Sequence, residues 1–153
     1  MAIFSKKNNL LLATDDADEV VSFIRKAERN TSGEIRVFIE SKCEYVNAMD
    51  RALEIFLKLE MSKTINRNAV LVYIAKIDRQ IAIVGDEGIH EKVKDVNLWD
   101  ESLSILKAYF KKDAFKEGII KVVENIGKEL NKYFPADGNS NRNEIPDEIV
   151  FGK

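Results

Sequence analysis

Five polar side chains stand at the ends of apolar segments, where a folded chain could use them for chemistry. They are Glu34 before the first segment, Arg67 and Asn68 before the second, and Asp86 and Glu87 after the third. Carboxylate and amide oxygens are the hard ligands that Ca²⁺ and Mg²⁺ take in proteins. An arginine beside them can hold a phosphate through two parallel hydrogen bonds. We therefore predict a metal site formed by Glu34, Asn68, Asp86 and Glu87, in which Arg67 binds phosphate.

The elements that would gather these side chains follow from the hydrophobic pattern. Residues 34–40 alternate as a strand does, and residues 46–61 carry a helical apolar pattern. Residues 70–75 are nearly all apolar, which is typical of a central strand covered on both faces. This order predicts a βαβ unit with parallel strands, and residues 80–84 then return antiparallel after a tight turn at 76–79. The five polar residues are therefore expected at one edge of a small mixed sheet.

Helices are expected on both sides of this sheet. The first opens near Thr14, where Thr14 or an aspartate can cap it, and Asp113 is expected to cap the last long helix. The buried stripe predicted for the helix at 46–61 consists of Met49, Ala52, Phe56 and Leu59, widened by Leu53 and Leu57. The fold class is therefore α/β.

Each candidate also has an ordinary structural interpretation. Charged residues at strand ends are usually solvated turn residues. His90 is either an acid–base group or an exposed residue of a short helix, and Cys43 is either a nucleophile or an inert thiol. The acidic cluster at 15–19 fits the electrostatics of a helix start better than a metal site.

Composition narrows the classes of function. A chain of 153 residues with 45% hydrophobic and 33% charged residues is typical of one globular domain. The net charge of -2 does not favour nucleic-acid binding. A single cysteine and a single histidine exclude an internal disulfide and a histidine-cluster zinc site. No apolar run reaches the ~18 residues that a membrane span needs, and the N-terminal apolar stretch is shorter than that of a signal peptide, so a cytoplasmic location is expected.

Three regions are predicted along the chain. Residues 1–13 form an N-terminal segment, residues 14–135 form the domain, and residues 136–153 form a tail. The Asn-rich part of the tail is predicted to be disordered. Its closing part, 144–152, is apolar enough either to dock on the domain or to bind a protein partner.

Several short motifs occur in an order that is characteristic of one family. They are Ser32–Val37, Arg67–Ala75 followed by Asp78-Arg79, Ile83–Ile89, Trp99 and Gly118-Ile119. This pattern resembles the TPM domain, a family that includes thylakoid-lumen repair and acid-phosphatase proteins. The resemblance implies a three-layer α/β/α sandwich, a divalent-cation site with Ca²⁺ as the expected ion, and phosphatase activity in some members.

The resemblance also identifies departures at the candidate site. Asn68 matches the asparagine of the family's Asp-Asn-Gly-Val-Leu motif, whereas Arg67 replaces its aspartate and Ala69 its glycine. Asp86 occupies a position that is often aromatic in distant members. Two hypotheses follow: a metal-assisted acid-phosphatase-like phosphomonoesterase, or a non-catalytic protein-interaction module regulated by calcium. The scarcity of acid–base residues favours the second.

Overall fold

The two apolar segments predicted to be parallel strands form the middle of a four-stranded sheet. The computed structural model describes residues 11–95, 97–136 and 145–152, and within them the strand order is β3-β2-β1-β4. Strands β1 (Glu34–Glu40) and β2 (Ala69–Ala75) are parallel, and β3 (Gln80–Gly85) is antiparallel to β2. The predicted βαβ unit and β-hairpin are both present, and the mixed sheet is confirmed.

The fourth strand comes from the tail and was not predicted. Strand β4 (Val150–Phe151) pairs in parallel with β1, with Val150 opposite Phe38. Ile145 and Ile149 are also buried, so the apolar residues of the tail pack on the domain. The stretch predicted to be disordered lies, from residue 137 to 144, outside the described residues.

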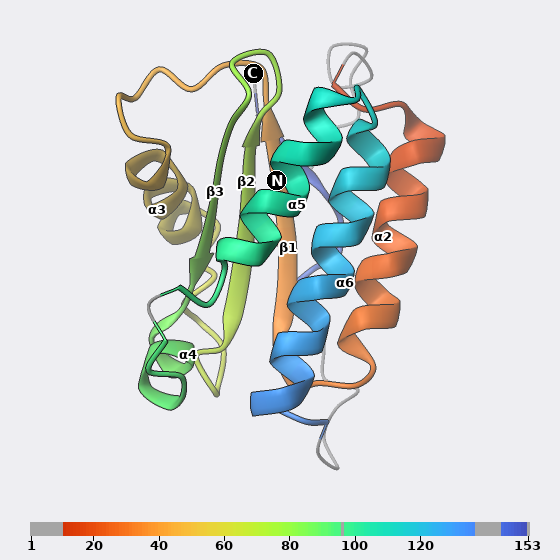
Figure 1. Ribbon diagram of the computed structural model, residues 1–153. Coiled ribbons are helices and arrows are strands. Elements are labelled where there is room, and N and C mark those ends of the chain that lie inside the picture. Colours follow the sequence, from red (N-terminus) through yellow and green to blue (C-terminus); the bar gives the residue numbers. More distant parts are fainter. Residues whose placement is uncertain (1–10, 96, 137–144, 153) are drawn as a thin grey trace.

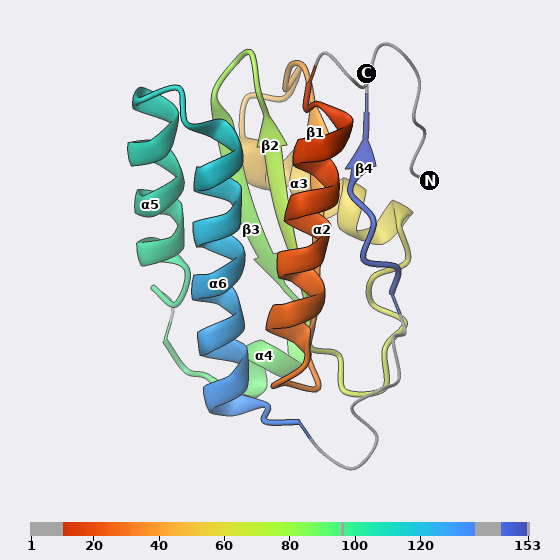
Figure 2. The ribbon, with the colours of Figure 1, turned by 90° about the vertical axis from the view of Figure 1, so that its right-hand side faces the viewer.

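Helices cover the sheet on both faces and give three layers (Figure 1). One face carries α2 (Thr14–Glu28), α5 (Asp100–Lys111) and α6 (Phe115–Tyr133), which lie side by side in Figure 2. The other face carries α3 (Ala48–Lys58), and the short α4 (Glu87–Lys92) follows the end of β3. The predicted α/β/α sandwich is therefore confirmed. In the part of the chain that the structure describes, every helix is too short or too polar to cross a lipid bilayer.

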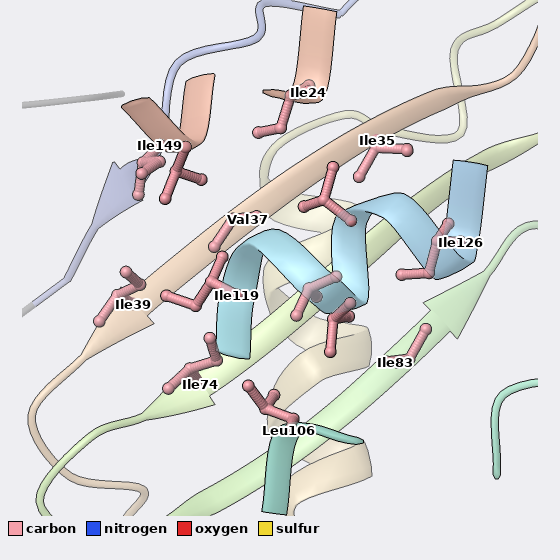
Figure 3. Close-up of a cluster of buried hydrophobic side chains, with 14 of the residues drawn as sticks. Ile24, Ile35, Val37, Ile39, Ile74, Ile83, Leu106, Ile119, Ile126 and Ile149 are labelled. Carbon is pink, nitrogen blue, oxygen red and sulfur yellow. The ribbon is translucent and has the colours of Figure 1, made fainter. Parts of the chain in front are cut away.

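The alternation along β1 and β2 divides the interior into two cores. Val37 and Val72 point toward the three-helix layer, where Figure 3 shows the isoleucine-rich cluster between β1, β2 and α6. Phe38 and Tyr73 point toward α3, and their rings stack with centroids 6.0 Å apart. A strand with apolar residues on both faces is stable only between two covering layers, so the pattern at 70–75 accounts for the architecture.

Helix α3 buries part of the predicted stripe, because Ala52 and Phe56 are buried as predicted. Its buried residues are Ala48, Ala52, Ile55 and Phe56. Met49, Leu53 and Leu57 are 38%, 44% and 66% exposed, so their prediction as core residues was wrong. The reason is that α3 is, among the described residues, the one helix packed on this face, and it touches the sheet along a narrow stripe. An apolar residue on its flank therefore has no second helix to pack against.

The predicted helix caps were also wrong. The residue before α2 is Ala13, and it makes no side-chain cap hydrogen bond. Asp113 has φ 56°, in the left-handed region, and its carboxylate pairs with Arg79 at 3.1 Å. Its backbone N–H donates to the Phe110 carbonyl at 3.1 Å, so Asp113 closes α5 instead of opening α6.

Candidate functional site

Strand direction brings the predicted site residues to one edge of the sheet. Glu34 lies opposite Ala69 in the register of β1 and β2. The Asp86 N–H donates to the Ala69 carbonyl at 3.0 Å, which places the end of β3 beside the start of β2. This edge is the end of the sheet where α4 lies in Figure 1.

The loop at 64–68 crosses the start of α4 at this edge, and the two backbones are in contact. We call this contact the loop crossing. The Gly88 N–H donates to the Arg67 carbonyl at 2.8 Å. A Cβ on Gly88 would lie 2.1 Å from the Asn66 carbonyl oxygen and 2.6 Å from that of Arg67, so this position requires glycine. Arg67 has φ 50°, a left-handed conformation that costs free energy for a residue with a Cβ. The crossing is therefore a tight and strained arrangement.

Arg67 contacts both neighbouring carboxylates at the crossing. Its Nε and Nη2 donate to the two oxygens of Asp86 at 2.8 Å and 2.9 Å. Its Nη1 lies 3.5 Å from the exposed Glu87 carboxylate. The hydrogen bond to Asp86 raises the pKa of Arg67. Asp86 is buried and also accepts the Glu87 N–H at 2.7 Å, which makes it the N-cap of α4.

The other two predicted ligands face different partners. Asn68 is buried, and its side-chain amide donates to Ser32 Oγ at 3.2 Å. Glu34 is buried, and its Oε1 accepts the Ile145 N–H of the docked tail at 2.6 Å. The structure thus divides the predicted ligands into Asp86 and Glu87 at the loop crossing, and Asn68 and Glu34 beside it.

A second acidic group lies beside Glu34 and was not found from the sequence. Glu28 Oε2 accepts the Ile35 N–H at 2.8 Å, and the Glu28 carboxyl is hydrogen-bonded to Asp147 of the tail. Burial, the hydrogen bond to Asp147 and the negative charges of Asp147 and Glu34 raise the pKa of Glu28 to about 10. Arg25 lies 3.4 Å from the Asp147 carboxylate. These groups come from a helix, a strand and the tail, so no sequence motif contains them.

The weaker candidates have ordinary structural environments. His90 is exposed on α4. The Cys43 thiol is half-buried and donates to the Tyr45 carbonyl at 3.6 Å. Lys116 of α6 lies 3.0 Å from Glu19, which ties the acidic start of α2 to the neighbouring helix.

A buried charged cluster occupies the opposite end of the sheet. Arg51 donates to both oxygens of Glu40 at 2.9 Å and 2.8 Å, and the Tyr73 hydroxyl donates to the same carboxylate. Burial and the hydrogen bond to Glu40 raise the pKa of Tyr73. The cluster was not predicted, because Glu40 and Tyr73 are members of strand patterns that otherwise indicate core packing.

The loop crossing fits a cation in part. Within residues 11–95, 97–136 and 145–152, no group of three or more acidic, histidine or cysteine side chains could hold a metal ion. Asp86 and Glu87 nevertheless converge on a single positive group, the Arg67 guanidinium. Backbone carbonyls and water commonly complete the oxygen shells of Ca²⁺ and Mg²⁺. The two carboxylates could therefore hold a divalent cation if Arg67 moved aside.

Comparison with known proteins gives one family and one fold. The family model of the TPM domain matches residues 6–129. The NMR structure of the BA42 protein from the psychrophilic bacterium Bizionia argentinensis is similar, with TM-score 0.82 and 38% sequence identity, covering 90% of this chain and 93% of that one. The N-terminal domain of the cg2496 protein from Corynebacterium glutamicum shares the fold, with TM-score 0.53 and 12% identity over 76% of this chain and 70% of that one. No curated protein matches the sequence.

Proposed function

The chain belongs to the TPM domain family, and we propose that it is a divalent-cation-binding module of that family, with Ca²⁺ as the expected ion and Mg²⁺ as the alternative. The observation that supports this proposal is the pairing of Arg67 with Asp86 and Glu87. The Asp86 and Glu87 carboxylates together attract positive charge, so a divalent cation can compete with the Arg67 guanidinium for them.

Arg67 is the competitor in this proposal. Its side chain is 40% exposed, so it can leave Asp86 for solvent without uncovering the core. A bound divalent cation supplies the positive charge that Asp86 and Glu87 then lack, and it polarises a phosphoryl oxygen where a phosphate is present. The left-handed backbone of Arg67 and the contact at Gly88 keep the two loops in place while the side chain moves.

The consequence that we propose is a regulated interaction with another protein. Movement of Arg67 changes the charge and shape of the surface formed by the loop at 64–68 and the start of α4. A partner that contacts this surface would bind the cation-loaded and cation-free forms differently, which is the thermodynamic requirement for regulation.

Phosphomonoester hydrolysis is the second proposed function, and it depends on the same movement. With Arg67 bound to Asp86, its Nε and Nη2 are both occupied. Once released, the guanidinium has the two-donor geometry that binds a phosphate. Turnover of p-nitrophenyl phosphate that requires calcium and disappears in Asp86→Asn would support this function. Absence of turnover would refute hydrolysis and leave cation binding as the proposed function.

Amide NMR titration with CaCl₂ and MgCl₂ tests the main proposal. We expect saturable shifts at residues 66–68 and 86–88, lost in Asp86→Asn. Arg67→Ala should bind calcium about tenfold more tightly, because the charge-assisted hydrogen bonds of Arg67 no longer compete with the cation for Asp86. Arg79→Ala is the matched control, because Arg79 also has a left-handed backbone and pairs with an aspartate. Shifts centred elsewhere, or equal affinities for Arg67→Ala and wild type, would refute the competition model.

A further inference from the structure

A groove lies at the end of the sheet opposite the loop crossing. It runs between α3 and the strands β1 and β4, has a volume of about 690 Å³, and is open to solvent. Its lining residues are Phe38, Glu40, Ser41, Lys42, Glu44, Arg51, Ile55, Lys58, Leu59, Val150, Phe151 and Gly152. The volume falls within the range of roughly 300–1,000 Å³ that is typical of small-molecule sites.

The position of the groove follows from the topology. Strands β1, β2 and β4 are parallel, and the groove lies beside the carboxyl end of β1. Ligands of open α/β sheets commonly bind outside the carboxyl ends of the strands. Helix α3 makes its main contacts with β3 and β2, so in the part of the chain that the structure describes the same face of β1 and β4 is left open as the groove.

The docked tail supplies one wall of the groove. The Gly152 N–H donates to the Ile39 carbonyl at 2.8 Å. A Cβ on Gly152 would lie 2.7 Å from the Phe38 ring and 3.0 Å from Glu40 Cβ, so the tail backbone rests directly on β1. Phe38 and Val150, whose side chains both lie on the α3 side of the sheet, then provide an apolar floor, and Leu59 provides the facing side.

The charged side chains that line the groove form two groups: a neutralised Glu40–Arg51 pair, and exposed residues whose net charge is positive. Glu40 is buried, and it receives two hydrogen bonds from Arg51 and one from Tyr73. Its charge is therefore compensated within the protein. Of the other charged residues of the lining, Lys42 and Lys58 are exposed and basic, and Glu44 is acidic. The exposed charge thus favours an anion above an apolar floor.

We propose that this groove binds a small organic anion, a carboxylate or sulfonate carried on an aromatic or aliphatic body. The body lies on Phe38, Leu59 and Val150, and the anionic group faces Lys42 and Lys58. Glu40 and Arg51 form part of the wall of the groove and do not bind the ligand. The reason is that the Glu40 carboxylate is already neutralised by its hydrogen bonds within the protein. This site is independent of the cation site, since six residues of strand, roughly 20 Å at 3.3 Å per residue, separate Glu34 from Glu40.

Titration with 8-anilinonaphthalene-1-sulfonate tests the proposal, with binding followed by fluorescence and by amide NMR. We expect saturable binding with shifts at Phe38, Leu59 and Val150. Lys42→Glu/Lys58→Glu should weaken binding about tenfold, because two exposed ionic contacts are reversed. Lys63→Glu, an exposed lysine beyond α3 that is outside the lining, should change affinity less than twofold. Asp86→Asn should leave the affinity unchanged.

A neutral probe separates the anionic contribution from simple apolar adsorption. N-Phenyl-1-naphthylamine has the same aromatic body without the sulfonate, and it should bind wild type about tenfold more weakly and be insensitive to the double lysine change. Equal binding of the two probes would overturn the anion selectivity. Shifts centred on the exposed Leu53 and Leu57 face of α3, or equal weakening by Lys63→Glu, would overturn the site.

Discussion

The carboxyl of Glu28 offers a quantitative test of how the tail is attached to the domain. It lies in a cluster with Asp147 of the tail and Glu34 of β1, and its pKa is raised from 4.5 to about 10, first by burial and then by the hydrogen bond to Asp147. The folded chain therefore holds a proton on Glu28 over a range in which the unfolded chain has released it. The perturbation that we choose is Glu28→Gln, which keeps an oxygen for the Ile35 N–H and an amide to donate to Asp147.

The sign and size of the effect follow from proton linkage. A carboxyl whose folded-state pKa is raised binds more protons when folded, so its contribution to stability is fully present below pH 4.5 and is lost as the pH rises toward the folded-state value. Each pH unit in this window corresponds to about 1.4 kcal/mol, so wild type should lose about 3 kcal/mol between pH 5 and pH 7 through Glu28. Glu28→Gln cannot ionise and should lose none of this amount.

Urea unfolding between pH 5 and pH 8 measures the difference directly. The free energy of unfolding of wild type should fall relative to that of Glu28→Gln as pH rises, and the variant should be the more stable protein at pH 8. Asp18→Asn is the control, because Asp18 is an exposed carboxylate on the same helix. Parallel pH profiles for wild type and Glu28→Gln would refute the assignment of a protonated Glu28 in the folded state.

Two further predictions concern the loop crossing and the tail. Gly88→Ala should lower the free energy of unfolding by about 3 kcal/mol or prevent folding, because its Cβ would meet two backbone carbonyls. Gly85→Ala should cost less, because its Cβ would lie 3.3 Å from side-chain atoms of Ile89 and Trp99 and from no backbone carbonyl among the nearest atoms. Equal costs of the two changes in urea unfolding would contradict this explanation. Ile149→Ala should cost about 2–5 kcal/mol, because Ile149 is 1% exposed within the larger core; a cost below 1 kcal/mol by the same assay would mean that the tail contributes little to folding.

Most of the fold could be predicted from the apolar patterns of the strands. Alternation at Glu34–Glu40 and the apolar run ending at Ala75 indicated the parallel pair, and chain direction alone then placed Asp86 beside the start of β2. These inferences succeeded because the side-chain period of a strand and the handedness of a crossover depend on local geometry. The stripe of α3 was mispredicted because sequence periodicity identifies apolar positions without saying whether a neighbour covers them.

The candidate site depended on contacts that no local pattern contains. The sequence by itself determined the α/β class, the order of the first three strands along the chain, the family and the presence of Arg67, Asn68, Asp86 and Glu87 near one edge of the sheet. Only the tertiary structure decided that Arg67 binds Asp86, and that Glu34 instead contacts the tail.

The physical reason lies in the range of the interactions. Strand and helix patterns reflect burial over a few neighbouring residues, and the sequence displays them directly. The partner of a carboxylate is whichever donor the folded chain brings within hydrogen-bond distance, and for Glu34 that donor is the Ile145 N–H of a tail at the far end of the sequence. The charged residues at the sheet edges were therefore visible in the sequence, and their pairing was decided by how the tail and the loops close over them.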